Sequence, residues 1–287
     1  MSGIEVRNLS KSYGSTQALN QVSVNFEKDK IYGLLGRNGA GKTTLLNIIT
    51  NRLFADSGEV LLDGKPIKEN DCVLSNIYMM SEKCLFPEKM RVRDVFKWTA
   101  AFYPQFDMDY ALKTAAKFEL DLKKKRDSLS TGYGSILKLV TAMSVNVPYV
   151  FFDEPVLGLD ANYRDLFYRL LIEKYSEKPF TAIVSTHLID EVSSVIEHVV
   201  MIDKGHIIKD EPIESILSQG YTITGPANSV DLFVADKDVM SYDMLGGLKT
   251  AYVSGKVPAE VPSNLEVTKM DLQKMFIKMT NDKEVSK

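Results

Sequence analysis

The segment Gly36-Arg37-Asn38-Gly39-Ala40-Gly41-Lys42-Thr43 constrains this chain more than any other feature. It matches the pattern G-x-x-x-x-G-K-[ST], in which the glycines let backbone N–H groups turn inward around a phosphate. Ile31-Tyr32-Gly33-Leu34-Leu35, directly before it, is an apolar run typical of a buried strand. Lys42–Thr50 is typical of a helix whose positive N-terminal end faces the anion. A strand, a glycine loop and a helix in this order predict a site for nucleotide phosphates.

The alternative is a Gly-rich turn that binds nothing, but the flanking strand and helix have the order that phosphate binding needs. Lys42 is then expected to reach the outer phosphates, and the Thr43 hydroxyl to bind Mg²⁺. The residues predicted to contact the nucleotide here are Gly36, Arg37, Asn38, Gly39, Ala40, Gly41, Lys42, Thr43 and Thr44.

A second set of candidate residues follows the apolar run Tyr149–Phe152, where the chain continues as Asp153-Glu154-Pro155. In P-loop enzymes an Asp at the end of a strand helps to hold Mg²⁺ beside the P-loop Ser or Thr. A neighbouring carboxylate can polarise the attacking water. We therefore predict that Asp153 binds Mg²⁺ with Thr43 and that Glu154 is a general base; the alternative is two solvated acids at a strand end.

Composition limits the class of protein. The chain has 287 residues, of which 45% are hydrophobic and 25% charged, as in a soluble globular protein. Its formal net charge of -3 argues against nucleic acid as a partner. No segment approaches the ~20 apolar residues of a membrane span, and residues 1–7 lack the basic and apolar regions of a signal peptide. These features predict a cytoplasmic location, in which Cys72 and Cys84 are ordinary thiols.

Hydrophobic patterns predict an α/β fold with three parts. Short strand candidates at Ile4–Leu9, Gln21–Phe26 and Gly58–Leu62 indicate an N-terminal antiparallel β portion beside a P-loop core. Helical periodicity from Val92 to Leu122, broken at Pro104, indicates a helical subdomain over about residues 84–147. Strands and helices then alternate, which predicts a sheet covered on both faces.

Beyond Leu217 the pattern changes to scattered glycines and short β-like runs at Leu232–Val234 and Thr250–Val253, with a final helix near Lys269–Met279. We predict a nucleotide-binding domain over residues 1–217 and a small α+β accessory or regulatory region over residues 218–287.

These motifs, in their order, resemble the nucleotide-binding subunit of an ABC transporter over about Ile4 to Gln219. In this resemblance Gly36–Thr43 is the Walker A loop and Tyr149–Glu154 is Walker B with its catalytic glutamate. Leu157-Gly-Leu-Asp160 is similar to the D-loop, which faces a partner subunit.

The resemblance assigns roles to two further residues. Tyr13 is similar to the aromatic residue that stacks on adenine, the alternative being a core aromatic. His187, in Ser185-Thr-His187, is similar to the switch histidine that contacts the γ-phosphate, the alternative being an ordinary surface histidine. The catalytic residues that the resemblance implies are Glu154, His187 and Lys42.

Two segments depart from the family pattern. The signature Leu-Ser-Gly-Gly-Gln stands here as Leu129-Ser130-Thr131-Gly132-Tyr133, in which Ser130 and Gly132 are kept and are expected to close on the γ-phosphate held by the opposite subunit. Thr131 adds a Cβ, and Tyr133 adds bulk, so the strength of dimer closure is in question. Glu82 stands where the family usually carries Gln; it can still reach Mg²⁺ or water but cannot donate a hydrogen bond while ionised.

The resemblance implies an ATPase that uses ATP and Mg²⁺, acts as a head-to-tail dimer with a second nucleotide-binding subunit, and drives export through a separate integral membrane permease. It would then lie at the inner face of the cell membrane, bound through the permease. The segment Leu129–Gly134 is similar to ABC-2 type exporters of the bacitracin or peptide-toxin kind. The alternative is a weakly hydrolysing regulatory subunit that pairs with an active ABC ATPase.

Overall fold

The computed structural model describes residues 3–258 and 260–281. The chain divides into two compact units. One holds the chain up to His187 together with Val200–Lys209, and the other holds Leu188–Val199 together with the chain from Asp210 onward. Within the described residues, no helix is long and apolar enough to cross a membrane.

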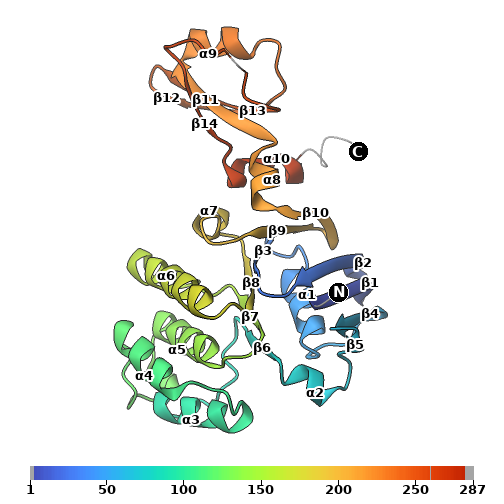
Figure 1. Ribbon diagram of the computed structural model, residues 1–287, viewed down its shortest axis with the longest axis vertical. Helices are drawn as coiled ribbons and strands as arrows, with labels where there is room; N and C mark the ends of the chain where they lie inside the picture. Colours follow the sequence, from blue (N-terminus) through green and yellow to red (C-terminus); the bar gives the residue numbers. More distant parts are fainter. Residues whose placement is uncertain (1–2, 259, 282–287) are drawn as a thin grey trace. The chain divides into compact units, whose positions relative to one another are not determined.

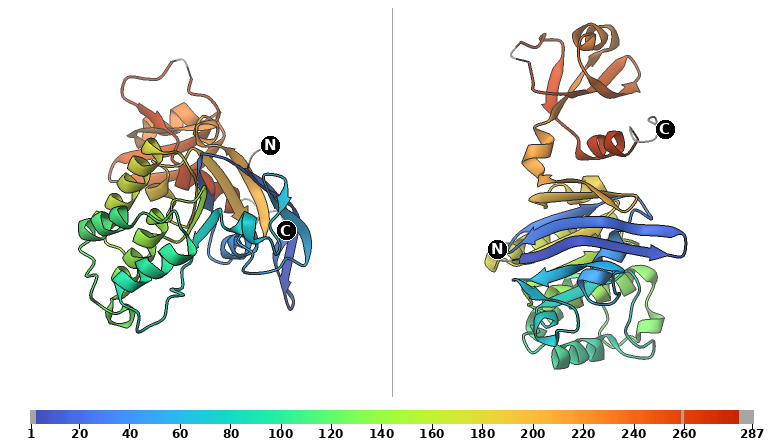
Figure 2. Two further views of the ribbon diagram at one scale, coloured as in Figure 1. Left: turned by 60° about the horizontal axis from the view of Figure 1, so that its bottom comes forward. Right: turned by 90° about the vertical axis from the view of Figure 1, so that its right-hand side faces the viewer.

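The first unit begins with an antiparallel sheet of order β2-β1-β4-β5. Its long strands are visible edge to edge in Figure 2. Alternate side chains of the first strand, such as Ile4 and Val6, are buried, as expected of a sheet with one face on a core. Its strands are β1 (Gly3–Tyr13), β2 (Thr16–Glu27), β4 (Ser57–Leu62) and β5 (Lys65–Pro66).

A second sheet of the order β10-β9-β3-β8-β7-β6 forms the centre of the fold. β3 pairs in parallel with β8, which pairs in parallel with β7, and β7 with β6. The strands β3, β7 and β8 are buried throughout because both faces are covered. The strands are β3 (Ile31–Leu35), β6 (Ile77–Met80), β7 (Tyr149–Asp153), β8 (Thr181–Thr186), β9 (His198–Asp203) and β10 (His206–Pro212).

Helices cover the two faces of this central sheet (Figure 1). On one face α1 (Lys42–Ile49) packs between the two sheets, with Leu45, Leu46 and Ile49 buried in a core shared with β1, β2, β3 and β7. On the other face lie α5 (Thr131–Ser144) and α6 (Ala161–Glu177). Phe167 of α6 packs on Phe152 of β7 with the ring centroids 5.5 Å apart.

The helical subdomain consists of α3 (Val92–Phe102), α4 (Met108–Lys117), the short η1 (Arg126–Ser128) and α5. Pro104 lies between α3 and α4, as its missing N–H and fixed backbone angle predict. Asp107 starts α4 by accepting a hydrogen bond from the Tyr110 N–H, at 2.8 Å. Among the described residues before Gly220 there are three further short helices: α2 (Asp71–Leu74), α7 (Ile189–Val192) and α8 (Ile213–Leu217).

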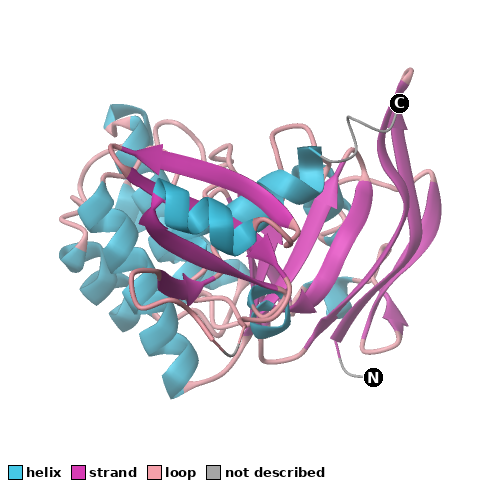
Figure 3. Ribbon diagram, turned by 90° about the horizontal axis from the view of Figure 1, so that it is seen from above, coloured by secondary structure: helices cyan, strands magenta, loops and turns pink. Residues whose placement is uncertain are grey.

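The second unit contains an antiparallel sheet of order β12-β13-β11-β14. The helix α9 (Ala227–Val234) lies across it (Figure 3), with Val230 and Val234 in a core shared with Ile223 and Val253. The strands are β11 (Gly220–Pro226), β12 (Val239–Leu245), β13 (Leu248–Ser254) and β14 (Glu266–Lys269), and α10 (Leu272–Asn281) follows.

The predicted α/β fold, with a P-loop core, an antiparallel β portion and a helical subdomain, is confirmed. The β-like run at Leu232–Val234 is wrong, because these residues form the last turn of α9. Val230 and Val234 are both buried at i, i+4 spacing, a helical signal that a three-residue window does not contain. The expected boundary at Leu217 falls inside the second unit; the division into domains 1–217 and 218–287 stays a prediction.

Candidate active site

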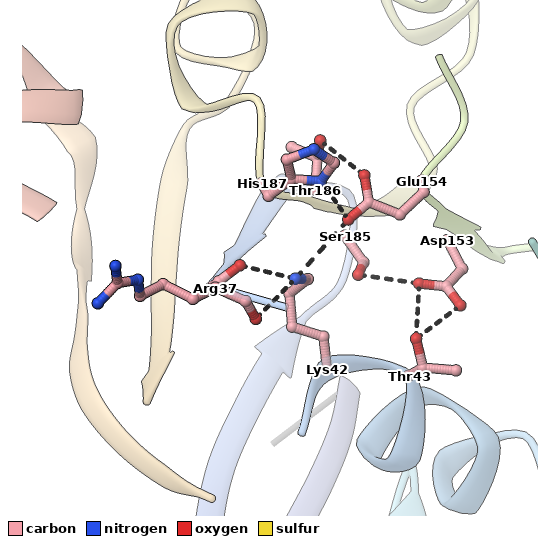
Figure 4. A network of polar contacts seen from close by, with 9 residues as sticks. Arg37, Lys42, Thr43, Asp153, Glu154, Ser185, Thr186 and His187 are labelled. Carbon is pink, nitrogen blue, oxygen red and sulfur yellow. Dashed lines mark hydrogen bonds and ion pairs between the residues drawn. The ribbon is translucent and has the colours of Figure 1, made fainter. Parts of the chain in front are cut away.

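Three neighbouring strands of the central sheet deliver the candidate residues to one edge. Leu35 of β3 is opposite Thr186 of β8, and Asp153 of β7 is opposite Ser185 of β8. Because the strands are parallel, the segments that follow them all leave the sheet at its carboxyl edge. The glycine loop, Glu154 and His187 therefore meet, although they lie far apart in the sequence (Figure 4).

The glycine loop has two positions where a side chain does not fit. At Gly36 an added Cβ would lie 2.6 Å from the backbone oxygen of Ile202. At Gly41 it would lie 2.6 Å from the backbone oxygen of Ala18, and the φ of 112° also disfavours other residues. This close packing lets α1 start at Lys42, directly after the loop, with its first N–H groups free of helical partners. The loop is therefore built to receive an anion.

Lys42 is a buried cation in the loop's cradle, with 6% of its side chain exposed. Its ammonium donates to the backbone oxygens of Gly36 and Arg37, at 2.7 and 3.4 Å. It also lies 3.7 Å from Oε1 of Glu154. Burial lowers the pKa of Lys42, while Glu154 and Asp153 oppose that change. An incoming phosphate would add the negative charge that favours the ammonium form.

Asp153 lies under the loop and is fully buried. Its carboxylate accepts hydrogen bonds from the Thr43 hydroxyl, at 3.0 and 3.3 Å, and from the Ser185 hydroxyl, at 3.1 Å. Burial raises the pKa of Asp153, and the two hydroxyl donors oppose that change. A hydroxyl and a single carboxylate beside a phosphate cradle are oxygen donors of the kind that Mg²⁺ takes in nucleotide sites. The residues present fit Mg²⁺.

Asp153→Asn is expected to stabilise the nucleotide-free protein at pH 7 by about 1 kcal/mol, because it removes a buried charge but keeps the shape. The folded-state pKa of Asp153 is raised above its ordinary value of 3.8. The folded protein therefore binds the Asp153 proton more tightly than the unfolded chain does. Protonation of Asp153 stabilises the folded protein at low pH, and this stabilisation is lost as the pH rises through the folded-state pKa of Asp153. Urea unfolding at pH 7 and near pH 4 measures both points. The difference should shrink at the lower pH, and a destabilised variant at pH 7 would contradict the expectation.

Glu154 follows Asp153 in the chain, but its carboxylate has different partners. It adopts the left-handed backbone region, with a φ of 49°, which turns its carboxylate away from that of Asp153. Oε2 accepts from the Thr186 hydroxyl at 3.2 Å, and Oε1 lies 3.0 Å from Nδ1 of His187. Since an ionised carboxylate only accepts, Nδ1 of His187 carries the proton in this pair. The carboxylate is thus oriented by one residue on each side.

The loop from Arg37 to Thr44, Glu154 and His187 line one cavity of about 490 Å³, whereas the predicted site residues Gly36 and Asp153 do not line it. Glu82 also lines it, and Ser130 and Gly132 do not. Tyr13 does not line it either: it stands half exposed at the end of β1, with Lys11 Nζ 5.9 Å from its ring centroid. The lining residues are Ala18, Arg37, Asn38, Gly39, Ala40, Gly41, Lys42, Thr43, Thr44, Glu82, Glu154, Leu157 and His187.

The altered signature lies at the start of α5. Ser130 is the N-cap of this helix and accepts a hydrogen bond from the Tyr133 N–H at 3.3 Å. An added Cβ at Gly132 would lie 2.8 Å from the backbone oxygen of Gly158, so this position needs glycine. The Tyr133 ring packs edge-on against Tyr163, with the centroids 6.5 Å apart. Tyr133 thus has a packing role within its own chain, which its sequence position did not predict.

Four residues of the site carried no predicted contact. Ser185 and Thr186 orient Asp153 and Glu154, and they stand directly before His187 at a strand end, which is the signal that could have found them. Ala18 and Leu157 also line the cavity, because tertiary packing brings their segments beside the glycine loop. No local pattern marks Ala18, and Leu157 was predicted in the D-loop, which was expected to face a partner subunit.

Comparison with known proteins agrees with this geometry. The profile of the ABC transporter family matches residues 19–157. The chain is 29% identical over 278 residues to the ABC transporter ATP-binding protein YtrB of Bacillus subtilis, covering 92% of this chain and 95% of that protein. It is 31% identical over 225 residues to the putative ABC transporter ATP-binding protein AlbC of the same organism, covering 74% and 93%.

The fold is also found among solved structures. A dimeric structure of the ATP-binding cassette MJ0796, in a post-hydrolysis state bound to ADP and Pi, superposes with a TM-score of 0.66. The identity is 23%, and the match covers 73% of this chain and 98% of that one. Sequence and fold lead to one conclusion: this chain belongs to the ATP-binding proteins of the ABC transporter family, which are ATPases.

Proposed function

We propose that this chain hydrolyses ATP at the cavity beside α1 and thereby drives export through a separate membrane permease. The observation that carries the proposal is the convergence of a phosphate cradle and an oriented carboxylate, Glu154, in one cavity, with the buried Asp153 bonded to the Thr43 hydroxyl that lines it. A structural glycine turn would need none of these side chains. Hydrolysis needs all of them.

Each group has a distinct role in the proposed reaction. The loop amides and Lys42 bind the β- and γ-phosphates, and Lys42 offsets their charge. Thr43 and Asp153 would hold Mg²⁺, with Glu82 near it, and this ion would supply charge neutralisation at the phosphates when bound. Glu154 accepts a hydrogen bond from the attacking water and orients it in line with the γ-phosphate. With both ring nitrogens protonated, His187 donates from Nδ1 to Glu154 and from Nε2 to the oxygens on which negative charge develops.

We propose that each site is completed by a second copy or a related subunit. Ser130 and Gly132 lie outside their own chain's cavity, at a helix N-terminus that suits a phosphate. In a head-to-tail pair they face the γ-phosphate of the partner's ATP. Loss of that phosphate on hydrolysis removes the group that joins the two subunits, and the pair opens.

The permease is proposed to contact the helical subdomain on the cytoplasmic side of the membrane. Trp98 and Phe102 of α3 are both exposed, and their ring centroids lie 5.9 Å apart. Exposed aromatic pairs of this kind suit an amphipathic partner helix. Export, of bacitracin or a similar peptide toxin, is supported by the likeness of Leu129–Gly134 to ABC-2 type exporters.

Two measurements test the proposed function. Phosphate release from Mg·ATP by the purified chain, with and without its permease, should exceed that of Glu154→Gln. Equal rates would favour a regulatory subunit that pairs with an active ATPase, an alternative that the altered Thr131 and Tyr133 motivate. In inverted membrane vesicles, ATP-dependent accumulation of labelled peptide would support export, and its absence beside active ATP hydrolysis would oppose it.

Tyr13→Ala is expected to raise the KM for ATP about tenfold, because stacking of a base on an aromatic ring is worth about 1–3 kcal/mol. Tyr13→Phe should keep the affinity, since it keeps the ring. Tyr242→Ala, at an exposed tyrosine of the second unit, is the matched control and should leave KM unchanged. An unchanged KM in Tyr13→Ala would mean that adenine stacks elsewhere.

A further inference from the structure

Lys138 is a buried cation that the proposed reaction does not use. It lies in the middle of α5 with 9% of its surface exposed. Its ammonium donates to the backbone oxygen of Ser81 at 3.2 Å, and to that of Glu82. Both acceptors belong to the loop after β6, which carries Glu82 into the nucleotide cavity. Lys138 therefore bonds to the backbone that supports a cavity side chain, across 56 residues of sequence.

Burial of the Lys138 ammonium lowers the stability of the folded protein unless its donors find acceptors. Burial lowers the pKa of Lys138, and the nearby Cys84, Glu82 and Asp153 oppose that change. A buried charge needs its donors satisfied by well-placed acceptors, and an apolar side chain of similar length would avoid the cost. The ammonium instead satisfies two carbonyl oxygens that lie in an irregular loop. Helix stability alone does not require it.

The same loop is tied at further points to η1, the segment that leads into α5. Arg126 Nη2 donates to the backbone oxygen of Cys84 at 3.3 Å, and the Arg126 N–H to that of Met90 at 2.9 Å. An exposed ion pair of 2.7 Å joins Lys89 to Asp127. The chain that leads into Ser130 thus runs beside the chain that leads away from Glu82. Among these contacts, the hydrogen bond from Lys138 is the one to the backbone of Glu82 itself.

α5 also holds the loop on the other side of the cavity. The Ser135 hydroxyl donates to the backbone oxygen of Leu157 at 3.1 Å, and Gly132 packs against Gly158. Leu157 lines the cavity. One helix therefore contacts both loops that flank its own chain's nucleotide cavity, and its N-terminus carries Ser130.

We propose that Lys138 is a positioning residue that locks the Glu82 loop to the helix beginning at Ser130. Movement of Glu82 toward or away from one nucleotide then moves the signature that faces the other nucleotide. This inference rests on the proposed function, since it needs ATP hydrolysis at a shared site. Its chemistry is a rigid hydrogen-bonded link, and Lys138 does not touch the nucleotide.

Lys138→Met, which keeps length and removes the donors, is expected to lower kcat for ATP hydrolysis about tenfold and to change KM less than twofold. Misplacement of a site group by a fraction of an ångström has effects of this order. Lys138→Arg keeps the donors and should restore most of kcat. Lys89→Met, which removes the exposed tie between the same two segments, is the matched control and should retain wild-type kcat.

A double-mutant cycle separates positioning from general damage. If Lys138 acts through Glu82, Lys138→Met adds little to the loss caused by Glu82→Ala, whereas independent effects would multiply and overturn the proposal. Alkylation gives a second reading: the thiol of Cys84, half buried beside Glu82, should react faster in Lys138→Met, with exposed Cys72 as the internal reference. An unchanged ratio of the Cys84 alkylation rate to the Cys72 alkylation rate would count against a locked loop.

Two outcomes distinguish this inference from the proposed function. Wild-type turnover equal to that of Glu154→Gln would remove the proposed function. Wild-type turnover above that background, with Lys138→Met equal to wild type, would overturn only the role of Lys138. Should Lys138→Met fail to fold, Lys138→Gln keeps an uncharged amide donor on a shorter side chain and should lower kcat about threefold, scaled from the same geometric argument; an unchanged kcat again overturns the proposal.

Discussion

Glu154→Gln is expected to lower kcat for ATP hydrolysis by about 10³-fold while leaving ATP binding intact. Glutamine has the size of glutamate but cannot accept a proton or hold the attacking water as a carboxylate does. The Lys42 ammonium donates to the backbone oxygen of Gly36, and this contact does not involve Glu154. The phosphates should therefore still bind to the glycine loop and Lys42. With hydrolysis blocked, the γ-phosphate that joins two subunits persists. The variant should therefore accumulate as an ATP-bound dimer.

Phosphate release and light scattering on the same samples check both parts of this expectation. Glu173→Gln is the matched control: it makes the same change at an exposed site on α6, where Glu173 pairs with Lys117 at 3.7 Å. It should retain wild-type turnover and show no added dimer. A Glu154→Gln protein that turns over ATP at the wild-type rate would remove Glu154 from the chemistry and leave the water to be oriented by another group.

The local parts of this site could be predicted because each has a short signal. The apolar run Ile31–Leu35, the glycine loop and the first turn of α1 are contiguous, and β3 has the predicted bounds. Asp153 and Glu154 were found because they end a buried strand. That these segments meet in space follows from parallel strands alone, since their carboxyl ends share one edge.

The contacts that escaped prediction depend on tertiary packing. Lys138 stands between Leu137 and Leu139 on α5, and nothing in its spacing indicates that it bonds to a loop 56 residues earlier. The bulk of Tyr133 puts the strength of dimer closure in question, but its packing on Tyr163 depends on where α6 lies and has no local signal. The run Leu232–Val234 failed for a related reason: β-propensity is a weak guide where burial of a helical face decides the structure. Sequence spacing identifies functional residues at the end of a strand. It does not identify residues whose contacts join elements far apart in the sequence.

Ser130→Asp is expected to lower ATP turnover about 100-fold without loss of stability. Aspartate caps a helix as well as serine does, so the hydrogen bond from the Tyr133 N–H should persist. In a shared site, however, its negative charge would face the γ-phosphate of the partner's ATP, and like charges at that distance in a dry site oppose closure strongly. ATP binding by the single subunit should be unchanged, because Ser130 does not line that subunit's own cavity.

The matched control is Asn70→Asp, which adds the same charge at another N-cap. Asn70 starts α2 by accepting a hydrogen bond from the Val73 N–H at 3.3 Å, and it does not line the nucleotide cavity. Its turnover and melting temperature should match those of wild type. A Ser130→Asp protein with wild-type turnover would mean that hydrolysis needs no signature from a second subunit.

Mixing two inactive variants extends this prediction to the head-to-tail arrangement itself. Lys42→Met disables the phosphate cradle, and Ser130→Asp disables the signature, so a dimer of either variant has two defective sites. A mixed dimer combines the intact cradle of one chain with the intact signature of the other at one of its two sites. Random pairing then restores about a quarter of the wild-type sites if subunits exchange freely. Turnover that appears only on mixing is the result that a site built within one chain cannot produce, because neither variant carries a complete site of its own.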